Sequence, residues 1–141
     1  MKRKTKISIP VPLEHPEQCA VIDWCDWNTK KYPCLAWIYA VPNGARTSIS
    51  VAKRLKKEGM RAGVPDLFLP FPKLKLGDRK PDGWCDHVYY HGLFIEMKRK
   101  KGSVTSPEQK AWHKYLLSAG YQVVIAKGAD EAVKFIKEYL E

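Results

Sequence analysis

The hydrophobic positions of the chain divide it into helical and strand-like segments. Residues 13–29 carry Val21, Trp24, Cys25 and Asn28 on one stripe at helical spacing, which predicts an amphipathic helix. The segment 48–59, SISVAKRLKKEG, predicts a second helix that is short and basic. Gly at its end is a typical helix stop.

Continuous apolar runs predict four buried strands. The first, CLAWIYAV, is followed by PNGA, which is typical of a turn. The second and third are GVPDLFLPFP and GLFIEMKRKK, and the fourth is YQVVIA. They occupy residues 34–41, 63–72, 92–101 and 121–126.

Two more helices are expected after the third strand. Ser106 can cap a helix, Pro107 suits its first position and Gln109 completes a capping box. The apolar stripe of this helix consists of Trp112, Tyr115, Leu116 and Ala119, and Gly120 ends it. DEAVKFIKEYL then predicts a closing amphipathic helix.

The order of these elements predicts one mixed α/β domain over residues 13–141, preceded by a basic arm over residues 1–12. The stretch between the second and third strands is rich in Pro, Gly and charge. It is long for a plain connection, so residues 71–91 are expected to form a hairpin extension or a functional loop.

Charge narrows the class of partner. The 141 residues include 25 Lys and Arg against 15 Asp and Glu, a formal net charge of +10. Such an excess favours a polyanion, nucleic acid before an anionic membrane surface. No apolar run approaches a membrane span, and the basic N-terminus lacks the apolar region of a signal peptide. We therefore expect a cytoplasmic protein, in the host cytoplasm if it is phage-encoded.

Cysteine spacing gives little support to a structural metal. The four cysteines contain no CxxC pair and are expected to be reduced thiols. Cys85, His87 and His91 are close enough to suggest zinc, but the spacing is not a standard zinc pattern and a fourth ligand is not evident.

The two central strands carry charge within their apolar runs. Alternation puts Glu96 and Lys98 on one face, opposite Ile95 and Met97, and if the strands are neighbours Asp66 converges with them. Paired carboxylates repel unless a cation lies between them, and few carboxylates plus water suit Mg²⁺. With a lysine beside it, this arrangement suits phosphodiester hydrolysis. The alternative is a solvated Glu–Lys pair with Asp66 as a turn residue.

These motifs resemble the PD-(D/E)XK nuclease signature, with PD at 65–66 and EMK at 96–98. EHPEQCAVIDW, VPNGARTS, GVPDLFL and the run from FIEMK to VVIA together resemble the VRR-NUC family, over about residues 14–126. The resemblance implies an α/β restriction-endonuclease-like core, with a mixed central sheet flanked by helices. It also implies DNA cleavage that depends on Mg²⁺ or Mn²⁺.

The resemblance also implies roles for individual residues. Asp66 and Glu96 would bind the metal with the Met97 carbonyl, and Lys98 would be the catalytic lysine. The family has an acid in its first helix, for which Glu14 is preferred over Glu17 because Glu14 lies four residues before Gln18. We therefore include Glu14 and Gln18 in the catalytic set. Gln109 matches the family's helix glutamine, although its capping role alone could explain it.

Several polar and basic residues are expected to bind nucleic acid. They precede the site or lie in basic runs, where phosphate contact competes with the alternative of a solvated surface. They are Asn43, Gly44, Arg46, Lys53, Arg54, Arg61, Lys100 and Lys101.

The resemblance further implies a homodimer that cuts branched DNA, such as four-way (Holliday) junctions or flaps. Trp24, Trp27, Trp37 and Trp84 exceed what one small core easily hides, and interfaces favour Trp. The alternative is a monomer with these rings in its core. Three alternatives remain open: a non-catalytic DNA-binding module of the same fold, an RNA-processing nuclease, and a metal-free structural protein.

Overall fold

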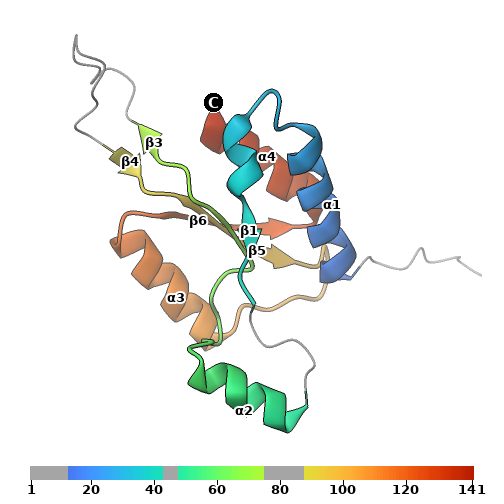
Figure 1. Ribbon diagram of the computed structural model, residues 1–141, viewed down its shortest axis with the longest axis vertical. Coiled ribbons are helices and arrows are strands. Elements are labelled where there is room, and N and C mark those ends of the chain that lie inside the picture. Colours follow the sequence, from blue (N-terminus) through green and yellow to red (C-terminus); the bar gives the residue numbers. More distant parts are fainter. Residues whose placement is uncertain (1–12, 43–47, 75–87) are drawn as a thin grey trace, which may run out of the picture.

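A computed structural model describes residues 13–42, 48–74 and 88–141 of the chain (Figure 1). The helices are α1 (Glu14–Trp27), α2 (Ile49–Lys57), α3 (Pro107–Ser118) and α4 (Ala129–Leu140), with a 3₁₀ helix, η1 (Pro33–Trp37). The strands are β1 (Tyr39–Ala40), β2 (Leu67–Leu69), β3 (Lys73–Leu74), β4 (Val88–Tyr90), β5 (Leu93–Lys98) and β6 (Gln122–Lys127).

The main sheet is mixed and has the strand order β1-β2-β5-β6. β2 is antiparallel to both β1 and β5, whereas β5 and β6 are parallel and are joined through α3. The neighbouring strands expected from the two charged apolar runs are therefore confirmed. β5 lies inside the sheet, paired along both of its edges.

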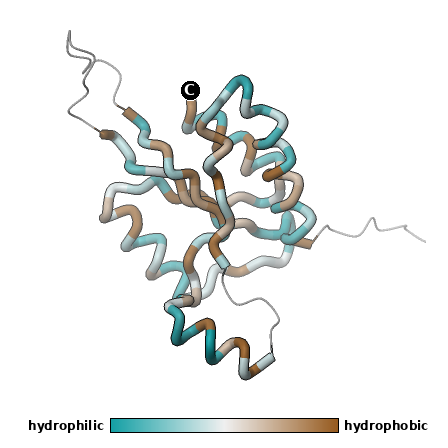
Figure 2. The backbone as a smooth tube through the Cα atoms, viewed as in Figure 1, coloured by the Kyte–Doolittle hydropathy of each residue, from teal (hydrophilic) through white to brown (hydrophobic). Residues whose placement is uncertain are grey.

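One face of the sheet is covered by the first and last helices. Val21 and Cys25 of α1, and Ala132 and Ile136 of α4, form a buried cluster with the apolar side chains of the sheet. Those of the sheet are Leu67, Leu69, Leu93, Ile95 and Met97. Figure 2 shows hydrophobic positions gathered along these central strands. The predicted core faces of the first helix and of the third predicted strand are confirmed.

The opposite face of the sheet is reached by α3. Its capping box is present as expected, with Ser106 and Gln109 bonded reciprocally. The predicted apolar stripe is wrong in part, because Leu116 is buried while Tyr115 is exposed. Gln109, His113 and Leu116 form the inward stripe instead, and this stripe carries two polar side chains to the sheet.

The prediction of a strand over residues 34–41 is wrong for most of that range. Pro33 starts a 3₁₀ helix that runs to Trp37 and buries only Leu35, and just Tyr39 and Ala40 join the sheet. The prediction assumed that this apolar run is buried, whereas the Trp37 side chain is 72% exposed. The fourth predicted strand forms, but at the sheet edge, where Ile125 is exposed.

The stretch between β2 and β5 contains the expected hairpin. β3 and β4 pair antiparallel, and residues 75–87 between them lie outside the described part of the chain. The base of the hairpin is attached to α4, since Lys73 donates to the Glu138 carbonyl at 2.8 Å and Tyr139 donates to the Phe71 carbonyl at 2.7 Å. In the described residues, no helix is long and apolar enough to span a membrane.

Candidate functional site

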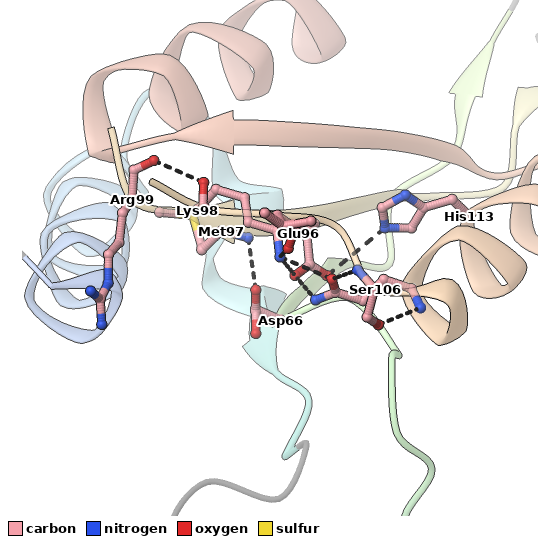
Figure 3. Close-up of polar contacts among 10 residues, drawn as sticks. Asp66, Glu96, Met97, Lys98, Arg99, Ser106 and His113 are labelled. Carbon is pink, nitrogen blue, oxygen red and sulfur yellow. Dashed lines mark hydrogen bonds and ion pairs between the residues drawn. The ribbon is translucent and has the colours of Figure 1, made fainter. Parts of the chain in front are cut away.

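Two carboxylates meet where β2 approaches β5. Leu67 pairs with Ile95, and continuing that register by one residue places Asp66 opposite Glu96. Asp66 Oδ2 accepts a hydrogen bond from the backbone N–H of Met97 at 2.7 Å (Figure 3). The N–H and C=O of one strand residue point toward the same edge of the strand, so the Met97 carbonyl also points toward the β2 side of β5.

A buried lysine lies beside Glu96. Glu96 and Lys98 are only 2% and 7% exposed, although both carry charge. Lys98 Nζ lies 3.3 Å from Glu96 Oε1 and donates to the Val104 carbonyl at 3.2 Å. Charged groups are rarely buried unless they are paired, and here the pairing holds both side chains in one geometry. The solvated Glu–Lys pair is therefore excluded.

Gln109 connects this pair to the start of α3. Its Oε1 accepts from Lys98 Nζ and from the Ser106 backbone N–H, each at 2.9 Å, while its Nε2 donates to Glu96 Oε1. Gly63 packs against the same turn, where a Cβ would lie 2.7 Å from the backbone nitrogen of Gln109. The capping role and a role in the site thus coexist in Gln109.

His113 is a further site residue that the sequence analysis missed. Its Nε2 lies 3.9 Å from Glu96 Oε2, and both atoms are buried with no hydrogen-bond partner in the part of the chain that the structure describes. The available signal was its spacing, because a residue four positions after Gln109 shares a helical face with it.

The electrostatics favour a neutral or cation-bound Glu96. Burial, and then the charge of Asp66, raise the pKa of the Glu96 carboxyl to about 7, against the lowering effect of Lys98. Burial, and then Lys98, lower the pKa of His113. A cation between the two carboxylates would reverse the repulsion that raises the pKa of Glu96.

The first-helix acids have different surroundings. Glu14 lines a pocket of about 340 Å³ together with Asp66, Glu96 and Lys98. Glu17 instead accepts from the backbone N–H of Ala129 at 2.5 Å, capping the start of α4. The remaining lining residues are Ala62, Gly63, Val104, Ser106, Glu108 and Gln109.

Gln18 lies one turn beyond Glu14 on α1 and is half-buried. It is not among the described residues that line the pocket. The structure therefore brings four of the five predicted catalytic residues together and leaves Gln18 apart.

The predicted nucleic-acid contacts are distributed over several elements. Lys53 and Arg54 are exposed on α2, a helix with no buried residue that projects from the sheet (Figure 1). Arg61 and Lys101 are also exposed. Lys100 Nζ lies 3.9 Å from Glu17 and 3.8 Å from Asp130, so this side chain also forms ion pairs within the fold. Asn43, Gly44 and Arg46 lie outside the described residues.

A cation at this site would be held by few side chains. Within residues 13–42, 48–74 and 88–141, no group of three or more His, Cys, Asp or Glu side chains could hold one. Asp66, Glu96 and the Met97 carbonyl are the oxygen donors predicted to bind it, Glu14 lines the same pocket, and water would complete a coordination typical of Mg²⁺. Glu96 Oε2, which has no hydrogen-bond partner among the described residues, fits this donor set. Cys85 and His87, considered for zinc, lie outside the described residues.

Comparison with known proteins shows the family and the fold of the chain. The sequence model of the VRR-NUC domain family matches residues 14–130. A solved structure described as a VRR_NUC domain protein is 28% identical, with a TM-score of 0.71, over 93% of this chain and 90% of that chain. No match is found among curated proteins.

Proposed function

The chain belongs to the VRR-NUC domain family, a nuclease family, and from this premise we propose that it is a DNA endonuclease dependent on Mg²⁺ or Mn²⁺. The observation that carries the proposal is the convergence of Asp66, Glu96 and Lys98 on one pocket of the sheet. Burial of a lysine with a carboxylate costs stability, and catalysis is a reason to retain both.

In this proposal Asp66, Glu96 and the Met97 carbonyl hold the cation. When bound, the cation would polarise the phosphate and lower the pKa of a coordinated water. Asp66 is oriented for this role by the N–H of Met97, which fixes one of its oxygens at 2.7 Å. The geometry of the donors is thus set by strand backbone, which is more rigid than a loop.

Lys98 acts on the phosphate in this proposal. Its ammonium group has three donors, and the carbonyl of Val104 and the Oε1 of Gln109 occupy two of them. The third faces Glu96 Oε1, 3.3 Å from Nζ. In the proposal this donor turns from Glu96 to a phosphate oxygen or to the attacking water when substrate and cation bind, and charge that develops in the transition state would strengthen the new bond. Glu14, which lines the same pocket, provides a further acid for positioning water or cation.

DNA binding would come from the basic surface near the pocket. Lys53 and Arg54 are exposed on α2, and Arg61 and Lys101 are exposed as well. Asn43, Gly44 and Arg46 stay predicted DNA contacts from the sequence and lie outside the described residues. Phosphate contacts of this kind position DNA without reading its sequence.

A homodimer acting on branched DNA is the finer part of the proposal. Its structural support is the exposure of two aromatic rings, since Trp27 and Trp37 are 80% and 72% exposed. A two-fold dimer would present two sites to the opposed strands of a junction. Light scattering behind a sizing column tests the assembly, and a mass near 16 kDa at micromolar concentration would refute it.

The activity is tested with a panel of labelled single strands, duplexes, flaps and four-way junctions. Each substrate is incubated with Mg²⁺, with Mn²⁺ and with excess chelator, and matched RNA strands address the RNA-processing alternative. Cleavage that requires the metal supports the proposal, whereas undiminished cleavage in chelator contradicts it. Binding without cleavage under every condition would favour the non-catalytic module.

A further inference from the structure

Four aromatic side chains form a row across the main sheet. Tyr39 of β1, Phe68 of β2 and Phe94 of β5 occupy paired positions, and Tyr121 directly precedes β6. Their ring centroids lie 5.7 Å apart for Tyr39 and Phe68, 4.2 Å for Phe68 and Phe94, and 5.3 Å for Phe94 and Tyr121. The four rings therefore form an unbroken series of contacts.

This row lies on the same face as the candidate active site. Asp66 precedes Phe68 by two residues, and Glu96 follows Phe94 by two residues, so alternation puts the acids and the rings on one side. Two residues of strand span about 7 Å. The rings thus lie two strand positions from the acids. A single nucleotide can span the distance between the rings and a phosphate held at the acids.

The row is not part of the main hydrophobic core. Phe68, Phe94 and Tyr121 are only partly buried and are absent from the buried cluster that α1 and α4 cover. Tyr39 is 51% exposed at the end of the row. Gly92 accommodates the row, because a Cβ there would lie 2.7 Å from the Phe68 ring. The inner rings therefore fix the position of an outer ring that remains accessible to solvent.

We propose that Tyr39, supported by Phe68, is a stacking site for an unpaired base of DNA next to the cleaved bond. This inference rests on the proposed function and narrows its substrate to DNA with unpaired nucleotides beside the cleavage position. Aromatic rings next to a basic groove bind single strands because every base has a face that can stack. Within a duplex the bases are already stacked on each other, so the ring offers such DNA no equivalent contact.

The test combines protein variants with a matched pair of flap substrates. One flap carries normal unpaired nucleotides beside the cleavage position, and the other carries abasic residues there, which keep the phosphates but remove the bases. Wild-type protein is expected to bind and cut the normal flap roughly 10-fold or more better than the abasic one. Tyr39→Ala should lose this preference, and Tyr39→Phe should retain it.

The matched control is Tyr115→Ala. Tyr115 is also exposed, at 62%, and also packs edge-on against an aromatic neighbour, Trp112, but it lies on α3 outside the row. This variant should keep the preference for the normal flap. Thermal melting of all three variants checks that each one folds.

The outcomes separate the two proposals. If wild-type protein cuts both flaps equally, or Tyr39→Ala still discriminates between them, the stacking site is wrong while the nuclease stands. Binding to both flaps is also measured with Lys98→Ala, which retains the aromatic row. If no substrate is cut under any metal condition but binding still depends on the bases and on Tyr39, the nuclease proposal fails and the stacking site stands.

Discussion

Gln109 Oε1 lies 2.9 Å from Lys98 Nζ, so a residue that caps a helix also positions the buried lysine. The same oxygen accepts from the Ser106 N–H, and the amide nitrogen donates to Glu96. A glutamine suits this place because its amide presents an acceptor to the lysine and a donor to the carboxylate at once. Helix stability and site geometry are therefore coupled through one side chain.

Replacing Gln109 by Ala should lower both stability and cleavage rate. The capping loss is expected to be about 1 kcal/mol of unfolding free energy. The rate should fall by about 10-fold or more, because Lys98 and Glu96 lose their common partner. Ser106→Ala is the control, since it removes the cap but leaves both Gln109 contacts. Urea unfolding and cleavage rates are compared, and equal rate losses in the two variants would assign Gln109 to the cap alone.

Lys98→Ala should lose about 10²-fold or more in cleavage rate while DNA affinity is retained. The reason is that Lys98 is buried in the pocket and contributes little to the exposed basic surface. Asp66→Asn and Glu96→Gln should abolish metal-supported cleavage and also retain binding. Single-turnover rates and fluorescence anisotropy measure the two properties. Variants that lose binding but keep their rate would show that these roles are misassigned.

The two acids of α1 should respond differently to substitution. Glu14→Gln is expected to lower activity with little change in stability, because Glu14 is exposed and lines the pocket. Glu17→Ala is expected to lower the free energy of unfolding by about 1–3 kcal/mol, because it leaves the buried cap of α4 unmade. Initial rates and urea unfolding are measured for both. A larger loss of activity in Glu17→Gln than in Glu14→Gln would transfer the role to Glu17.

The metal-free protein should become less stable as pH rises from about 5 to 8. The pKa of Glu96 is raised from 4.5 to about 7 in the folded state, so the folded state favours the protonated carboxyl. The contribution of this carboxyl to the free energy of unfolding is about 3 kcal/mol below the unfolded-state pKa, and it is lost as pH rises through 7. Mg²⁺ should restore stability at pH 8.

The comparison that isolates this effect is Glu96→Gln in chelator. The pKa of His113 is lowered, so its contribution to stability is lost as pH falls, which is opposite to the contribution of Glu96. The pH dependence of the wild-type protein alone is therefore the sum of the two contributions. Between pH 5.5 and pH 8, the free energy of unfolding measured with urea should fall more in the wild-type protein than in Glu96→Gln. Parallel curves for the two proteins would contradict the role of Glu96 in this pH dependence.

Basic residues of α2 should set part of the salt dependence of DNA binding. The double variant Lys53→Ala, Arg54→Ala is expected to reduce the slope of log K against log salt by about 0.9 per lost phosphate contact. Lys134→Ala is a matched control on α4, because Lys134 pairs with Glu138 as Arg54 pairs with Glu58, at the same side-chain exposures of 70% and 58%. Equal slopes for the double variant and the control would remove α2 from the interface.

Much of the fold could be predicted because local and global signals agree in the central elements. Val21 and Cys25 mark a helix face, and Ile95 and Met97 mark a strand face, and each of these faces is buried. The capping box at Ser106 is a local signal that needs no tertiary information. The charges at Asp66 and Glu96 made the candidate site predictable, because ionised groups in apolar runs need a compensating partner or cation.

Other features depend on contacts that no local pattern encodes. Leu35 is buried in a 3₁₀ helix while Trp37 points to solvent, because the short β1 leaves little sheet for the segment to join. Lys100 looks like part of a basic run, but Glu17 and Asp130 lie beside it. His113 enters the site only because α3 crosses the face of the sheet that carries Glu96.

The cap that Glu17 provides to Ala129 joins residues 112 positions apart. Glu14, Asp66, Glu96 and Gln109 likewise come from four separate stretches of the chain, and β5 and β6 pair in parallel only after α3 has crossed over. Contacts of such long range form late and slow the folding of a domain. A partly folded chain therefore keeps these side chains apart, and the candidate site is assembled only when the whole domain has folded.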